Sequence, residues 1–172
     1  MKRIAIVGFG FMGRVHLGAW RAMKRAEVVA VADQDAGKKE SVTWEGQKWY
    51  PGLQELLAGE CIDLVDVCVP THLHAENVRI ALNSGCDVIC EKPLCIDINE
   101  ARGLSALAAE RGRRLFVGHV LRYFPEYRVL KETVGAGQIG APGVARARRI
   151  GSYPPDGRGW YADTSLSGGV VF

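Results

Sequence analysis

Residues 2–13 read KRIAIVGFGFMG, and this stretch decides how the rest of the chain folds. Residues 2–7 form an apolar run typical of a buried strand, and residues 8–13 fit the pattern G-x-G-x-x-G. A helical pattern begins within the glycines, and a second apolar run, residues 28–32, ends at Asp33, which lies 20 residues past the last glycine. A strand, a glycine-rich turn, a helix, a second strand and an acid in this order are the setting in which the pattern binds a dinucleotide.

Each glycine of the pattern has a physical task. Gly8 allows a tight turn, Gly10 lets a pyrophosphate approach the backbone, and Gly13 lets the helix pack closely on the strand. The start of the helix offers backbone N–H groups to the phosphates, and the Asp33 carboxylate accepts hydrogen bonds from the adenosine ribose hydroxyls. The alternative is a glycine-rich turn that binds no ligand. The remaining members of the predicted loop site are Phe9, Phe11 and Met12.

The choice between NAD and NADP depends on the residues that follow the second strand. Asp33 repels a 2′-phosphate, and the next two residues, Gln34 and Asp35, include no arginine that would bind one. We therefore predict NAD as the cofactor and regard NADP as disfavoured.

Apolar runs alternate with helical patterns along residues 1–118. The predicted strands are residues 2–7, 28–32, 48–50, 64–69, 87–90 and 115–117, and helices are expected between them. Such alternation indicates an α/β fold with a Rossmann-type doubly wound parallel sheet. Right-handed crossovers place the carboxyl ends of all strands at one edge, where ligands bind. Asp66 interrupts one of the apolar runs and receives no role from the pattern.

Residues 119–172 have a different character. A helix is expected over residues 125–134 and a strand over residues 143–153, and the chain closes on a glycine-rich apolar run at residues 168–172. One helix and one strand are too little to bury a core of their own. We predict that residues 1–118 form an NAD(P)-binding domain and that residues 119–172 are the incomplete start of a second domain. Its assignment as an α+β domain for substrate binding and oligomerisation is implied by the family resemblance given below.

Composition argues against several classes of protein. The net charge is +3 and the basic residues do not form a nucleic-acid-binding module, so we expect no nucleic-acid partner. No stretch approaches the roughly 20 apolar residues of a membrane span, so we expect no membrane partner. Five cysteines without a secretory leader indicate reduced thiols and a cytoplasmic protein. Their spacing does not match a zinc site, and we expect no metal.

Lys92 is the residue to which the pattern assigns catalysis. It follows the predicted strand at residues 87–90 and lies between Glu91 and Pro93. Pro93 restricts the residue before it, Lys92, to an extended backbone, so the side-chain amine of Lys92 has a defined direction. Beside an oxidised nicotinamide ring, burial and like charge favour the neutral amine, which takes a proton from a substrate hydroxyl while a hydride leaves the carbon. The alternative is a surface lysine paired with Glu91.

Further polar and aromatic residues follow other predicted strands. The candidates for cofactor binding among them are Pro70, Thr71, His72, His74, Arg122 and Trp160. The two histidines begin a helix, where they face the ribose and nicotinamide in one interpretation and water in the other. Arg122 suits a carboxylate or phosphate, or else an interdomain salt bridge. Trp160 covers a cofactor or packs in a core, and these alternatives stay open.

Several motifs together resemble one enzyme family. They are the loop at residues 8–13 with Asp33, VCVPTHLHAE at 67–76, EKP at 91–93, GHVLRYFPEYR at 118–128, GQIGAPG at 137–143 and WYADTSLSGG at 160–169. As a set they resemble the glucose–fructose oxidoreductase, inositol dehydrogenase and MocA (Gfo/Idh/MocA) family along the whole chain. The resemblance implies reversible hydride transfer between NAD and a sugar, cyclitol or related hydroxyl compound.

The resemblance also implies roles for individual residues. Lys92 corresponds to the catalytic lysine of the family's E-K-P motif. Family members continue past the Gly-Gly segment to an Asp and a His that complete the active site, and to a large open sheet that shapes the substrate pocket and often forms the oligomer interface. A small polyol or sugar substrate and a homo-oligomer are therefore implied. The residues that correspond to positions around the family's cofactor are Phe9, Met12, Asp33, His74 and Glu91.

Two interpretations of function follow. The first is a nicotinamide-dependent oxidoreductase of this family, present as a chain that ends at Phe172, before part of the active site. The second is a non-catalytic dinucleotide-binding or regulatory module. A Rossmann dehydrogenase of amino-acid metabolism is disfavoured by the EKP and PTHLHAE motifs. On the first interpretation the 172 residues bind cofactor without turnover, and residues 140–172 self-associate or are disordered.

Overall fold

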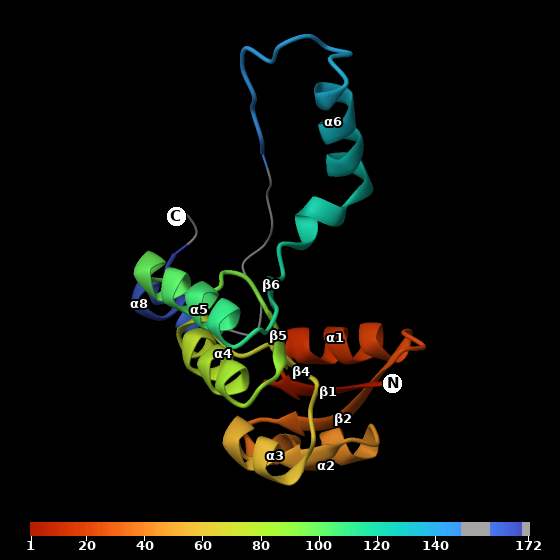
Figure 1. The fold of residues 1–172 in the computed structure, drawn as a ribbon, viewed down its shortest axis with the longest axis vertical. Coiled ribbons are helices and arrows are strands. Elements are labelled where there is room, and N and C mark those ends of the chain that lie inside the picture. The colour runs from red at the N-terminus through yellow and green to blue at the C-terminus, as the bar shows by residue number, and fades with distance from the viewer. Residues whose placement is uncertain (149–158, 170–172) are drawn as a thin grey trace. The chain divides into compact units, whose positions relative to one another are not determined.

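The computed structural model describes residues 1–148 and 159–169 of the chain. Residue contacts divide the chain into two units, and each is described by itself (Figure 1). Unit 1 holds residues 1–118 together with the described residues from Trp160 on, and unit 2 holds the described residues from His119 to Gly159. The division into domains that the sequence predicts stays a prediction, and the segment that begins at Trp160 groups with unit 1 by its contacts.

Unit 1 is built around a sheet of six parallel strands. Their order across the sheet is β3-β2-β1-β4-β5-β6, and every neighbouring pair is parallel. This is the order of a doubly wound dinucleotide-binding sheet, in which the direction of winding reverses between β1 and β4. The fold class predicted from the sequence is therefore confirmed. The strands are β1 (Lys2–Val7), β2 (Ala26–Ala32), β3 (Lys48–Tyr50), β4 (Leu64–Val67), β5 (Asp87–Cys90) and β6 (Leu115–Val117).

Helices connect the strands of unit 1 and cover both faces of the sheet (Figure 1). The helices and 3₁₀ turns between the strands are α1 (Phe11–Arg21), η1 (Ala36–Lys38), α2 (Lys39–Trp44), α3 (Leu53–Gly59), η2 (Thr71–Leu73), α4 (His74–Asn83) and α5 (Ile98–Glu110). After β6 come α7 (Gly159–Ala162), whose first residue belongs to unit 2, and α8 (Thr164–Ser167). The short helix α8 lies against η2. Across the described ranges 1–148 and 159–169, no helix has both the length and the apolar character needed to cross a bilayer.

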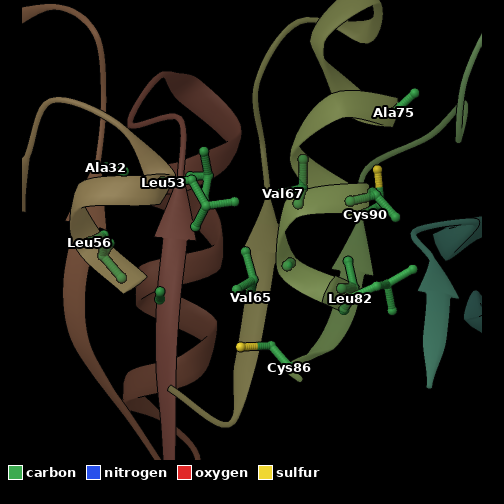
Figure 2. Close-up of a cluster of buried hydrophobic side chains, with 14 of the residues drawn as sticks. Ala32, Leu53, Leu56, Val65, Val67, Ala75, Leu82, Cys86 and Cys90 are labelled. Atoms are coloured by element: carbon green, nitrogen blue, oxygen red, sulfur yellow. The ribbon is translucent and has the colours of Figure 1, made fainter. Parts of the chain in front are cut away.

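Side chains alternate across each strand, and this alternation builds a core on each face of the sheet. On one face, Ile4 and Ile6 of β1 pack with Leu17 of α1 and Val42 of α2. On the other face, side chains from β1, β2, β4 and β5 pack under α3, α4 and α5. Figure 2 shows part of this second core, which contains Ala32, Leu53, Leu56, Val65, Val67, Ala75, Leu82, Cys86 and Cys90.

The turn between β1 and α1 has no room for a side chain at two positions. Gly8 has a φ of +91°, a region that favours glycine, and a Cβ there would lie 2.8 Å from the backbone of Cys68. A Cβ at Gly13 would lie 2.1 Å from the carbonyl oxygen of Gly8. Helix α1 therefore begins close to the end of β1 only because residue 13 is a glycine, as the pattern predicts.

Unit 2 contains the 3₁₀ turn η3 (Val120–Tyr123) and the helix α6 (Pro125–Gly135), which are in contact. The helix predicted over residues 125–134 is thus confirmed. No strand is present over residues 143–148, so the strand predicted to begin there is wrong for these residues. The rest of that predicted strand, residues 149–153, and the apolar run at residues 170–172 lie outside the described residues.

Two glycines of α1 provide a matched test of the close turn. Gly13→Ala is expected to lower the free energy of unfolding by at least about 2 kcal/mol, because the new methyl group meets backbone that must move. Gly18 is exposed and a Cβ there meets nothing within 4 Å, so Gly18→Ala is expected to raise the free energy by about 0.5–1 kcal/mol. Urea denaturation measures both changes, and a shift of the same sign in the two variants would contradict this account.

Candidate dinucleotide-binding and catalytic site

The carboxyl ends of the strands bring the predicted site residues to one edge of the sheet. The glycine-rich loop follows β1, Asp33 follows β2, residues 70–74 follow β4, and residues 91–93 follow β5. The strands β1 and β4 are direct neighbours, and in open α/β sheets the reversal of winding between two such strands leaves a crevice for a ligand. Four segments that are far apart in the sequence therefore line one candidate site.

The glycine-rich loop is tied to the end of β2 by Asp33. The Asp33 carboxylate accepts a hydrogen bond from the N–H of Phe9 at 2.6 Å and another from the N–H of Asp35 at 2.9 Å. Gly10 is the N-cap of α1, and a Cβ there would meet nothing within 4 Å. The backbone at the start of the helix is thus open to a ligand, and helix N-termini attract anions through their N–H groups and dipole.

Lys38 also lies at this site, although no motif in the sequence indicates it. Its Nζ lies 3.1 Å from Oδ1 and 2.9 Å from Oδ2 of Asp33. The turn η1 positions Lys38, and Asp35 caps this turn by accepting a hydrogen bond from the N–H of Gly37 at 2.9 Å. An Asx-type turn that begins at Asp35 is the signal that could have placed Lys38 near Asp33. Lys38 thus brings a positive charge next to the carboxylate that is predicted to repel a 2′-phosphate.

The segment that contains Lys92 leaves the sheet at the end of β5. Glu91 is buried, and its N–H donates to the carbonyl of Val67 at 2.9 Å. The N–H of Lys92 donates to Oε2 of Glu91 at 3.1 Å, and the peptide bond between Lys92 and Pro93 is cis. Lys92 itself is exposed, in contrast to the partial burial expected beside a cofactor. The buried carboxylate therefore holds the backbone of Lys92, while the amine stays accessible.

His74 joins two of the loops at this edge. Its ring is buried, with Nδ1 2.7 Å from the carbonyl oxygen of Pro93 and Nε2 2.9 Å from that of Val69. Burial lowers the pKa of His74, an effect that the two carbonyls partly offset. In this arrangement His74 shapes the site by holding the loop after β5 against the loop after β4.

Asp66, which the sequence analysis could not assign, has two partners on α1. It lies on the face of β4 that α1 covers, because Val65 and Val67 belong to the core on the other face. Nδ1 of His16 lies 2.9 Å from its carboxylate, and Nε1 of Trp20 donates to it at 2.6 Å. His16 and Trp20 are four residues apart and so share one side of the helix. A buried acid within an apolar strand predicts such partners, because a buried charge is costly unless it is paired.

The ring of His16 also reaches the end of β5. Its Nε2 lies 3.4 Å from Oε1 of Glu91, and its Nδ1 lies 3.4 Å from Sγ of Cys68. Hydrogen bonds with Asp66, Cys68 and Glu91 raise the pKa of His16 to about 12. Burial acts to raise the pKa of Glu91, but the hydrogen bonds with His16 and with the Lys92 N–H bring it below its usual value. At neutral pH, His16 is therefore an imidazolium between two carboxylates.

The same cluster has the donor atoms of a metal site. Ligand atoms of His16, Asp66 and Cys68 lie within 4.8 Å of one another. Metal ligands must release their protons, yet hydrogen bonding raises the pKa of His16 to about 12 and burial raises the pKa of Cys68 to about 12. In the absence of an ion both side chains keep their protons at neutral pH, so an ion that bound here would have to displace two protons.

Other predicted residues surround these groups within unit 1. Phe11 is exposed and Met12 is half-buried at the start of α1. Pro70 precedes η2, Thr71 begins it in a buried position, and His72 within it is exposed. Their roles in cofactor binding stay predictions.

Two predicted cofactor residues lie later in the chain. Trp160 stacks on Tyr161, with the ring centroids 4.1 Å apart. Arg122 is exposed in η3 and belongs to unit 2. The cofactor roles of Trp160 and Arg122 also stay predictions.

The described residues fit an extended dinucleotide. The start of α1 suits a pyrophosphate, and Asp33 suits the adenosine ribose. Lys92, at the end of β5, provides an accessible amine on the far side of β1 and β4 from β2. This arrangement can hold a nicotinamide cofactor and exchange a proton with a second molecule beside it.

Comparison with known proteins places this geometry in a family. A sequence profile described as "Oxidoreductase family, NAD-binding Rossmann fold", the Gfo/Idh/MocA profile, matches residues 2–119. Inositol 2-dehydrogenase 3 of Saccharopolyspora erythraea is 36% identical over 146 residues, which are 83% of this chain and 43% of that protein. The 1,5-anhydro-D-fructose reductase of Ensifer adhaerens is 30% identical over 99% of this chain and 52% of its own length.

Solved structures show the same likeness. A myo-inositol 2-dehydrogenase from Lactobacillus plantarum matches with a TM-score of 0.76 and 30% identity, over 81% of this chain and 42% of that one. GenD2 from gentamicin A biosynthesis, in complex with NAD, matches with a TM-score of 0.76 and 31% identity, over 80% of this chain and 40% of its own. The chain thus spans about half or less of the length of these relatives.

We expect His16 to stay protonated in the folded chain at about pH 9, because its partners raise its pKa to about 12. The unfolded chain releases this proton near its ordinary pKa of about 6.5. Protonation of His16 therefore makes its full contribution to the free energy of unfolding below about pH 6.5, and this contribution declines as the pH rises toward 12. Nitrogen-15 NMR of the His16 ring, recorded with and without concentrated urea, measures both states. A neutral ring in the folded chain at about pH 8 would refute the ion pair.

Proposed function

The chain belongs to the Gfo/Idh/MocA oxidoreductase family with an NAD-binding Rossmann fold, and on this premise we propose that it provides the cofactor site and proton carrier of an NAD-dependent dehydrogenase. The proposed substrate is a cyclitol, sugar or related polyol, and the proposed assembly is a homo-oligomer. The observation that carries the proposal is the meeting of the glycine-rich loop, Asp33 and Lys92 at one edge of the sheet. Relatives named for inositol and for anhydrofructose support the substrate class.

Each group at this edge has a part in the proposed reaction. The backbone at the start of α1 binds the pyrophosphate, and Asp33 binds the adenosine ribose. A bound nicotinamide ring supplies the acceptor or donor of the hydride. Lys92 in its neutral form takes the proton of the substrate hydroxyl, so that the O–H bond breaks as the carbonyl forms. In the reverse direction the Lys92 ammonium returns this proton to the carbonyl oxygen.

A second candidate is a dinucleotide-binding module without catalysis, because the chain covers only 43% of the inositol dehydrogenase relative. We expect a polypeptide of these 172 residues to bind NADH without oxidising polyols. Fluorescence titration with NADH and an absorbance assay with NAD⁺ and myo-inositol test this expectation. Loss of NADH binding would contradict both, and turnover by the 172-residue polypeptide would contradict the second.

Cofactor preference tests the charges around the ribose site. NADH is expected to bind more tightly than NADPH, because Asp33 repels a 2′-phosphate. Lys38 offsets part of that repulsion from 2.9 Å, so Lys38→Met is expected to weaken NADPH binding at least tenfold, or about 1.4 kcal/mol, and to change NADH binding less than threefold. Lys39→Met is the matched control, since Lys39 lies over the ring of Trp49. Equal losses in the two variants would contradict the role of Lys38.

Substitution of Lys92 tests the proton carrier in a protein that spans the full length of the dehydrogenase relatives. Lys92→Ala is expected to abolish hydride transfer and to leave NADH affinity within threefold, because the amine contacts the substrate rather than the phosphates. Steady-state rates with a cyclitol and a parallel NADH titration measure the two effects. Activity within tenfold of the parent, a loss of at most about 1.4 kcal/mol of transition-state stabilisation, would show that another group carries the proton.

A further inference from the structure

His16 lies between carboxylates that belong to two different strands. Its Nδ1 is 2.9 Å from Asp66 in the middle of β4, and its Nε2 is 3.4 Å from Oε1 of Glu91 just after β5. All three side chains are largely buried, with exposed fractions of 18% for His16, 1% for Asp66 and 10% for Glu91. One imidazole ring of α1 thus connects the centre of the sheet with the end of the strand that leads to Lys92.

The carboxylate of Glu91 is held from several directions. Oε1 faces His16, and Oε2 accepts the backbone N–H of Lys92 at 3.1 Å. On the side of β6, a Cβ at Gly118 would lie 3.2 Å from Oε1, so the chain there comes close to the carboxylate. Because Glu91 has little space in which to turn, contacts that fix its carboxylate also fix the backbone N–H of Lys92 that is bonded to it.

The charges explain why Glu91 stays in this position. Two buried carboxylates that face the same ring would repel each other, and each would be costly to bury alone. A protonated His16 lies between them and attracts both. Without the positive charge on His16, the Glu91 carboxylate is no longer attracted toward α1. Its Oε2 is then no longer held where it accepts the Lys92 N–H.

We propose that His16 is a positioning residue for Lys92, and that it acts by clamping the Glu91 carboxylate whose second oxygen holds the Lys92 N–H. This inference rests on the proposed function, in which Lys92 carries the substrate proton. It also gives α1 a second task, because the helix that begins at the pyrophosphate site carries the clamp one turn further along. The backbone of Lys92 is thereby fixed relative to α1, at whose start the cofactor binds in the proposed function, and not by the loop after β5 alone.

A purely structural role for His16 is the competing explanation. In that case the pair of His16 and Asp66 would stabilise the packing of α1 on β4, and the contact of His16 with Glu91 would have no effect on Lys92. The variant Glu91→Gln separates the two explanations. The single acceptor oxygen of a glutamine amide cannot serve both His16 and the Lys92 N–H, whereas His16 keeps its contact with Asp66, which also accepts from Trp20.

The experiment is NMR spectroscopy of the nitrogen-15-labelled 172-residue chain, in the parent and in His16→Gln, Glu91→Gln and the double variant. The backbone order parameter of Lys92 is expected to be about 0.85 in the parent and below about 0.6 in each single variant. The double variant is expected to match Glu91→Gln, since His16 acts through Glu91. In Glu91→Gln, the Nε2 resonance of His16 is expected to shift more than the Nδ1 resonance, which faces Asp66.

Each outcome decides for or against the clamp. His119→Gln, the same substitution at an exposed histidine of unit 2, is the control and is expected to leave Lys92 rigid. An unchanged Lys92 order parameter in His16→Gln, or a further loss in the double variant, would overturn the inference. Where His16→Gln fails to fold, an unchanged Lys92 or an unmoved His16 Nε2 resonance in Glu91→Gln overturns it equally. A parallel NADH titration of the parent tests the proposed function independently of these signals.

Discussion

The close approach of two backbone segments at Gly8 and Gly13 is the constraint on which this site depends. Only 2.1 Å separates the carbonyl oxygen of Gly8 from the place where a Cβ of residue 13 would lie, so α1 can start beside the end of β1 only with glycine at this position. From that start, one side of the helix carries His16 and Trp20 to the buried carboxylate of Asp66. The absence of a side chain at residue 13 thus decides where the predicted phosphate site lies and which side chains of α1 reach the centre of the sheet.

The sheet of unit 1 could be predicted from the sequence because its signals are local. The predicted boundaries of β1, β3, β5 and β6 agree with the structure, since each of these strands is an apolar or aromatic run flanked by turn residues or charge. The parallel arrangement follows from the helices between the strands, because a crossover returns the chain in the same direction. The tight turn and close packing at Gly8 and Gly13 could also be predicted, because glycine spacing reports directly on backbone geometry.

The polar contacts of the site could not be predicted, because they depend on how distant segments are brought into register. Asp66 meets His16 across 50 positions of sequence, and the meeting depends on which face of β4 turns toward α1. Lys38 reaches Asp33 only because a 3₁₀ turn shortens the path between them. The strand expected at residues 143–153 is absent over residues 143–148 for a related reason, since a segment becomes a strand only where a neighbouring strand offers hydrogen bonds.

The pairing of Asp66 with His16 also restricts which substitutions the chain tolerates at these two positions. Loss of His16 alone leaves two carboxylates buried, and loss of Asp66 alone leaves a buried imidazolium with one acid fewer. Breaking a buried ion pair in this way typically costs about 3–5 kcal/mol, whereas exchanging both partners for apolar residues is often neutral. A single substitution at either position is therefore expected to destabilise the fold more than the simultaneous replacement of both residues, so the two positions can be exchanged only together.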